Sequence, residues 1–337
     1  EKVDSEISQI DKPIVMKGQL YEESAVIHRN QLMLPLNFVQ DRLDPALDYD
    51  EAAETAVVTT AAITQRSLRS EELTDYVKQA PVRLQFPVQR IEDEFYMPWD
   101  VLELLYRIVI QESDETGAVI VREVDELVQW GVARESENHS AKIIPLRHGG
   151  DSKKPIVYEM EPGTLVEILN ETDQGWYRLQ LNNGYIGYAP KSNIQLKGME
   201  RVSGKEREEV NVPWHATGGK VNLTWDPIYS RNPELDTREA MPGVNVISPS
   251  WFRLKDGSGN LTNQADLAYV QWAHDQGYQV WALFSNDFDP DKTAQALSTS
   301  ESRANMIRQL LIYAEMYQLQ GINIDFENVY LEDKDLV

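Results

Sequence analysis

Segment 322–327 alternates apolar and polar side chains, and its polar members are Asn323, Asp325 and Glu327. Successive side chains of a strand point to opposite faces, so this pattern predicts a strand with all three polar groups on one face. Carboxyl groups two residues apart lie roughly 6 to 7 Å apart at their α-carbons, close enough to influence each other's ionisation. We expect a general acid at Glu327, nearer the carboxyl end of the strand, beside a charge-stabilising partner at Asp325.

The elements around this strand predict how it is positioned. A solvated surface strand would also present one acidic face, but here large apolar residues fill every other position and an amphipathic helix precedes the strand. Alternation within a strand and helix series favours a β/α barrel, with the polar set at an interior mouth and the apolar set under the helices. The strands are predicted at 221–225, 244–248, 279–284 and 322–327, and the helices at 264–276 and 301–318.

Residues 320–327, Gln-Gly-Ile-Asn-Ile-Asp-Phe-Glu, resemble the Asp-Gly-x-Asp-x-Asp-x-Glu signature of glycoside hydrolase family 18, the chitinase-like barrels. Gln320 stands for the first Asp and Asn323 for the second, differences typical of the branch similar to spore-cortex and peptidoglycan N-acetylglucosaminidases. Segments 246–252 and 273–288 resemble the second and third strand regions of that branch. The resemblance covers 216–337 and implies a TIM (β/α)8 barrel.

This resemblance implies hydrolysis of β-1,4 bonds in a glycan that contains N-acetylglucosamine, either peptidoglycan or a chitin-like polymer. The implied mechanism is substrate-assisted and retaining. Glu327 would protonate the glycosidic oxygen while the N-acetyl oxygen of the substrate attacks the anomeric carbon. Asp325 would orient the acetamido N–H, and Asn323 would hold Asp325 by a hydrogen bond.

Three more residues, Trp225, Trp251 and Asn286, fall at predicted carboxyl ends of strands, where barrel enzymes keep their substrate-binding groups. Packing in the core would explain each of them as well, so both roles stay open. The sequence predicts no cofactor and no metal. The five histidines fall singly, without the spacing of a zinc site, at His28, His139, His148, His215 and His274.

The chain has 337 residues, a formal net charge of −23 and no cysteine. This charge argues against nucleic acid or an anionic membrane as the main partner, and the lack of cysteine excludes disulfides and thiol chemistry. We expect an exported protein of the cell envelope, the spore surface or the extracellular space. Since the chain starts at Glu1 without a charged-then-apolar leader, we expect that a leader has been removed or that the start is missing.

Residues 1–125 contain an internal repeat. Segment 31–39 recurs in outline at 94–102, and each copy predicts a strand running into a proline that opens a short helix. Downstream, segments 50–59 and 114–121 each predict a turn that feeds a strand. We therefore expect two α+β stalk repeats.

The repeat unit resembles the stalk modules known as copper amine oxidase N-terminal-like domains, although Asn37 and Asp100 stand where such modules often have Arg. The resemblance implies a role in spacing or wall attachment. Because His28 is the lone histidine of this region, no copper is expected.

Residues 140–197 predict a small all-β barrel, because five short β-type runs are separated by turn signals. Segments 175–177 and 184–189 resemble the bacterial Src-homology-3-type domain, which implies a cell-wall peptide as partner and no catalysis here. Trp176 is either a residue of the binding groove or a buried core indole.

The predicted organisation is therefore multidomain, with linkers at 126–139 and 198–215. An eight-stranded barrel takes about 250 residues, so 216–337 predicts only its amino-terminal half, and we expect this fragment to be inactive by itself. A non-catalytic glycan-binding or spore-coat structural protein on the same fold is the alternative. Loss of the catalytic Glu would be its expected sign, and Glu327 is present.

Overall fold

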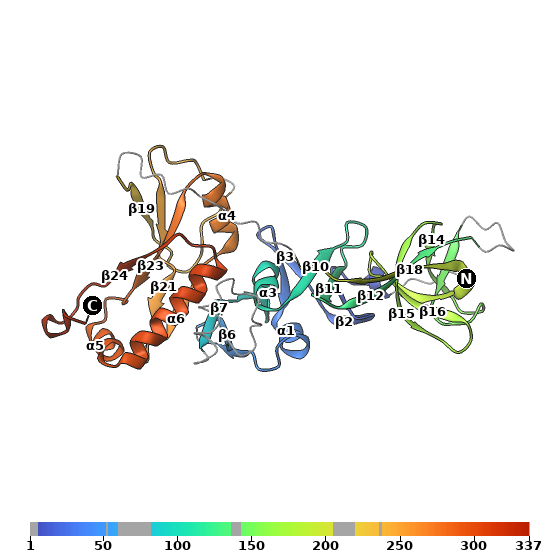
Figure 1. Cartoon of the computed structure of the whole chain (residues 1–337), viewed down its shortest axis with the longest axis horizontal. Coiled ribbons are helices and arrows are strands. Elements are labelled where there is room, and N and C mark those ends of the chain that lie inside the picture. Colours follow the sequence, from blue (N-terminus) through green and yellow to red (C-terminus); the bar gives the residue numbers. More distant parts are fainter. Residues whose placement is uncertain are drawn as a thin grey trace. The chain divides into compact units, whose positions relative to one another are not determined.

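The computed structural model describes residues 6–51, 53–59, 82–135, 143–204, 220–235 and 238–336 (Figure 1). Contacts divide the chain into two compact units. Unit 1 combines Glu1–Phe38 with Arg107–Glu206, and unit 2 combines Val39–Tyr106 with Arg207–Val337. In the described ranges, none of the helices is both long and apolar enough to cross a membrane.

The first sheet of unit 1 has the strand order β10-β11-β1-β2, with β1 parallel to β11 and antiparallel to β2. Its strands are rich in Val and Ile, residues that favour the extended backbone. Unit 1 also contains the hairpin of β3 and β4. The bounds are Glu6–Gln9 for the 3-10 helix η1, Pro13–Met16 for β1, Gln19–Ser24 for β2, Val26–His28 for β3, Gln31–Pro35 for β4, Ile108–Glu112 for β10 and Val119–Glu123 for β11.

The second sheet of unit 1 is the predicted small β-barrel, with the strand order β14-β13-β17-β16-β15-β12-β18. Its core contains Leu146, Met160, Val166 and Leu179. The five predicted runs are present as β13 to β17. The bounds are Leu127–Ala133 for β12, Ile144–Arg147 for β13, Ile156–Met160 for β14, Leu165–Glu171 for β15, Trp176–Leu181 for β16, Ile186–Pro190 for β17, Lys191–Asn193 for the 3-10 helix η2 and Ile194–Arg201 for β18.

The predicted linker 126–139 is wrong in its first half, because β12 lies there and pairs with both β15 and β18. Two of the inward residues of β12 are Gly131 and Ala133, so the apolar alternation that marks a strand is weak. A Cβ at Gly131 would approach Ile194 to 2.7 Å, which shows how closely β12 and β18 pack there. The second predicted linker, 198–215, likewise begins inside β18.

Unit 2 begins with elements from the predicted stalk repeats. The sheet β5-β6-β7 is antiparallel, and β8 pairs with β9 in a hairpin. Both repeat copies form a strand followed by a short helix, but Pro98 is the extended N-cap of its helix, with ψ 136°, rather than its first residue. The bounds are Leu36–Arg42 for α1, Asp48–Asp50 for β5, Thr55–Thr59 for β6, Arg83–Pro87 for β7, Gln89–Ile91 for β8, Glu94–Pro98 for β9 and Trp99–Leu105 for α3.

The main sheet of unit 2 contains four parallel strands in chain order, β19, β20, β23 and β24 (Figure 1, yellow-brown to red). They correspond to the four predicted strands, while the β21–β22 hairpin and α5 were not predicted. A closed eight-stranded barrel stays a prediction. The bounds are Leu223–Asp226 for β19, Val246–Pro249 for β20, Phe252–Leu254 for β21, Leu261–Asn263 for β22, Leu267–Asp275 for α4, Gln279–Ser285 for β23, Pro290–Ser298 for α5, Ser300–Met316 for α6, Gly321–Asp325 for β24 and Leu331–Asp333 for the 3-10 helix η4.

The β5-β6-β7 sheet of unit 2 is joined to the sheet that contains the parallel strands through Tyr313 of α6. This side chain is buried, and its hydroxyl accepts from Gln85 N at 2.7 Å and donates to Gln85 O at 3.1 Å. Phe252 stacks on the Tyr313 ring at 5.2 Å between centroids, and Asn263 Nδ2 donates to Gln85 O at 3.0 Å. The predicted separation of a 1–125 domain from a 216–337 domain is therefore wrong for this part of the repeats, because β7 belongs to the core of unit 2.

Candidate active site at the carboxyl edge of the parallel sheet

The two candidate catalytic carboxylates lie at the carboxyl end of β24. Asp325 is the last residue of this strand and pairs with Ser285 of β23, while Glu327 lies two residues beyond the strand. Asp325 is half-buried and Glu327 is exposed, so both are accessible from solvent. The predicted apolar face is less covered than expected: Ile324 is 55% exposed, since within the described ranges β24 pairs with β23 alone.

Asn286 fixes the backbone of Glu327. Its Nδ2 donates to Glu327 O at 2.7 Å and to Thr293 Oγ1 at 2.9 Å, and its Oδ1 accepts from Glu327 N at 3.1 Å and Phe288 N at 3.3 Å. These four bonds use both donors and both lone pairs of the amide, and the side chain is fully buried. The predicted substrate contact of Asn286 is therefore not supported by its position, which makes it a positioning residue for Glu327.

Asn323 is held by a different partner from the one that the resemblance implies. Its Nδ2 donates to the buried Ser248 Oγ of β20 at 3.0 Å rather than to Asp325. Both polar side chains thus lie on one face of the sheet, although β23 separates their strands. The bond fixes the orientation of the Asn323 amide at the start of the acidic segment.

The two tryptophans predicted to bind substrate have different environments. Trp251 is fully buried, donates from Nε1 to Asn232 Oδ1 at 2.7 Å and packs edge-on against Tyr269, so its role is packing. Trp225, near the end of β19, is 66% exposed. Of the two, only Trp225 presents an indole that a ligand can reach, and substrate binding stays a prediction for it.

A third carboxylate at this edge, Asp226, was not identified from the sequence. It ends β19, forms an ion pair with Arg238 and accepts a hydrogen bond from Tyr269 OH at 2.5 Å. Burial raises the pKa of the Tyr269 phenol and the bond to Asp226 raises it further, so the phenol stays a donor. The guanidinium of Arg238 also lies over the Trp272 ring at 4.9 Å. Asp226 is therefore engaged by protein groups, which leaves Asp325 and Glu327 as the catalytic candidates.

Metal binding has no support in the described part of the chain, where no cluster of three or more His, Cys, Asp or Glu side chains could hold an ion. His274 lies close to the start of the acidic strand, and its Nε2 is 3.0 Å from Gln320 Oε1. Burial lowers the pKa of this imidazole. Asp325 and Glu327 supply two carboxyl groups at this edge.

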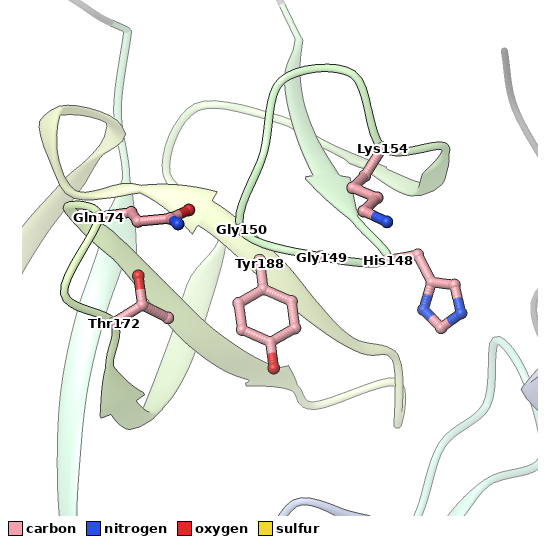
Figure 2. A pocket seen from close by; sticks show the side chains of 7 residues that line it. All are labelled: His148, Gly149, Gly150, Lys154, Thr172, Gln174 and Tyr188. Carbon is pink, nitrogen blue, oxygen red and sulfur yellow. The ribbon is translucent and has the colours of Figure 1, made fainter.

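Unit 1 carries a separate pocket of about 420 Å³ on the β-barrel (Figure 2). The loop from β13 to β14 and the turn from β15 to β16 form its walls, and Tyr188 of β17 lies between them in this view. A Cβ at Gly150 would lie 3.5 Å from Trp176 Cγ, so the half-buried Trp176 contacts this wall. The lining residues are His148, Gly149, Gly150, Lys154, Thr172, Gln174 and Tyr188, with no carboxylate among them.

Comparison with known proteins identifies the β-barrel. Residues 144–195 match the bacterial SH3 domain, which confirms the prediction for this segment. An uncharacterized glycosylase of Bacillus subtilis, YvbX, is 29% identical over 97 residues, which cover 27% of this chain and 28% of YvbX.

Two solved structures are also similar to parts of the chain. The spore cortex-lytic enzyme SleL of Bacillus cereus has 18% identity and a TM-score of 0.29, over 42% of this chain and 33% of that one. A chitinase from Bacteroides thetaiotaomicron has 18% identity and a TM-score of 0.28, over 34% and 39%. The chain thus spans between 28% and 39% of the length of these three relatives.

Proposed function

We propose that this chain provides the catalytic carboxylates of a glycoside hydrolase that cleaves β-1,4 bonds in N-acetylglucosamine-containing glycan. The observation that carries the proposal is the position of Glu327, which is exposed at the carboxyl end of a parallel strand while Asn286 fixes its backbone. Catalytic groups of parallel β/α enzymes lie at this edge. The likeness to the glycosylase YvbX and the family 18 signature at 320–327 support the same activity.

In the proposed mechanism Glu327 gives its proton to the glycosidic oxygen as the bond from that oxygen to the anomeric carbon breaks. The acetamido oxygen of the substrate attacks the anomeric carbon from the other face, and Asp325 accepts the acetamido N–H and stabilises the positive charge that develops. A water molecule then opens the cyclic intermediate and loses its proton to Glu327, so the configuration at the anomeric carbon is retained.

The substrate that we propose is peptidoglycan of the bacterial wall or the spore cortex, with a chitin-like polymer as the second candidate. The bacterial SH3 domain at 144–195 supports the cell wall as the location. We propose that its pocket holds a cell-wall peptide, because Lys154 and His148 supply cationic or donor groups in a chain of net charge −23 and the lining has no carboxylate. An exported protein of the cell envelope, spore surface or extracellular space fits both roles.

Replacement of Glu327 by glutamine tests the activity. Wild-type protein should release reducing ends from purified peptidoglycan or from N-acetylglucosamine oligomers, and E327Q should lose that turnover while it still binds the glycan. The exposed Glu332 offers a matched control, because E332Q changes the same group five residues away. The assay should compare the 337-residue chain with a longer form extended beyond Val337, and we propose that turnover needs the longer form. Unchanged turnover in E327Q would overturn the assignment of the acid, whereas glycan binding without turnover in the longer wild-type protein would favour the non-catalytic alternative.

A further inference from the structure

We propose that Phe288 is a substrate-binding residue that stacks on a pyranose ring of the glycan beside Glu327. The inference rests on the proposed glycosidase function and adds a residue to its site. Phe288 lies in the loop between β23 and α5, and its side chain is 57% exposed. A phenyl ring with this exposure presents an aromatic face that a ligand can reach.

The loop is linked to the backbone around Glu327 at two places. Asn286 bonds to both the N–H and the carbonyl of Glu327, and Asn328 Nδ2 donates to Phe288 O at 3.0 Å. Asn286, two residues before Phe288, is therefore tied to the backbone of the acid, and Asn328, the residue after the acid, is tied to the backbone of Phe288. A sugar ring that contacts Phe288 would be held at a fixed position relative to the Glu327 carboxyl group.

The backbone of this loop is strained. Asp287 and Phe288 have φ values of 60° and 57°, in the left-handed region that glycine adopts readily and bulky side chains rarely do. Polar contacts hold this conformation without the phenyl ring: Asp287 N donates to Ser285 Oγ at 2.9 Å, Lys292 pairs with Asp287 at 3.2 Å, and Phe288 N donates to Asn286. Glycine at 288 would relieve this backbone strain, so the aromatic side chain stands at a position where the backbone conformation costs free energy. Strain of this kind is found at functional sites.

The chemistry of an exposed aromatic ring indicates the ligand. A pyranose ring presents a face of C–H groups, which an aromatic face covers with little loss of conformational freedom. The edge of the sugar stays free for a hydrogen bond from its acetamido N–H to Asp325. The site therefore fits an N-acetylhexosamine unit next to the bond that Glu327 cleaves.

Three variants of the full 337-residue chain test the proposal: Phe288→Gly, Phe288→Trp and Glu327→Gln. Binding of an N-acetylglucosamine pentamer is measured by calorimetry, and Tm by thermal unfolding. We expect F288G to raise Tm, or leave it unchanged, and to weaken binding by about tenfold. F288W should bind within about twofold of wild type, because it restores an aromatic face.

Two results would overturn the proposal. A fall in Tm for F288G would show that the ring packs in the fold, and pentamer binding by F288G at the wild-type level would show that the ring does not contact the sugar. Failure of the proposed function has a different result: wild type and E327Q would both fail to bind the pentamer and purified peptidoglycan. If they bind and F288G binds equally well, the glycosidase proposal stands and the role of Phe288 alone is excluded.

Discussion

Replacement of Asn286 by aspartate tests how the proposed acid is positioned. The variant keeps the shape and the acceptor of the side chain but replaces both N–H donors, so a carboxylate oxygen would face Glu327 O and Thr293 Oγ1, now 2.7 and 2.9 Å from Nδ2. Loss of two hydrogen bonds at a fully buried residue should lower the free energy of unfolding by about 2 to 5 kcal/mol. Repulsion of the Glu327 carbonyl should also move the acid, and a displacement of about 1 Å costs on the order of 100-fold in rate.

Two measurements separate these effects. Urea unfolding of the 337-residue chain gives the change in stability, and release of reducing ends from N-acetylglucosamine oligomers by the longer form gives the change in turnover. Asn305→Ala is the control, because Asn305 of α6 donates to Ser258 O and Asn260 Oδ1 in the loop between β21 and β22 rather than to the Glu327 segment. We expect its turnover to be unchanged. Wild-type turnover in N286D together with unfolding within about 0.5 kcal/mol of wild type would refute the positioning role.

Three further predictions concern stability and wall binding. Tyr313→Phe should lower the free energy of unfolding of unit 2 by about 1 to 3 kcal/mol in urea, because the Gln85 N–H loses the hydroxyl that accepts from it, while Gln85 O keeps its bond from Asn263. Tyr330→Phe at the surface should change it little. Burial lowers the pKa of His274 in the folded chain, so as the pH falls the unfolded chain binds this proton first, and stability should fall below about pH 6.5. His274→Gln should reduce the change of Tm with pH in thermal unfolding. An unchanged dependence of Tm on pH would exclude the histidine as its source. Lys154→Glu should reduce the fraction of the chain that sediments with purified peptidoglycan, whereas Lys153→Glu, outside the pocket lining, should leave it unchanged. An equal reduction in both variants would show a general effect of charge rather than binding in the pocket.

The strands of unit 2 were predictable because their side chains alternate with period two or form short apolar runs, as in 279–284 and 322–327. Helix α5 was missed although its signals are present: Asp289 accepts from Lys292 N as N-cap, and Pro290 follows it. Strand β12 was missed for a physical reason, since inward glycine and alanine suit a close approach of strands but carry no apolar pattern.

The candidate acid was predictable because it belongs to a local motif, whereas the group that fixes it was not. Asn286 precedes Glu327 by 41 residues, and its partner is a backbone that any residue would supply. The burial of Trp251 could not be predicted from the sequence either. From sequence, a tryptophan after a strand looks the same whether its indole faces a substrate or packs on Tyr269.

The interleaved make-up of unit 2 has a consequence for how the protein is made. Gln85 and Tyr313, which bond to each other, are 228 residues apart. At a synthesis rate of about 5 to 20 residues per second, the strand β7 leaves the ribosome roughly 10 to 50 s before its helix partner exists. During that interval Phe86, fully buried in the finished protein, lacks the Tyr313 ring on which it packs edge-on. The contacts that join β7 to α6 can therefore form only after most of the chain has been synthesised.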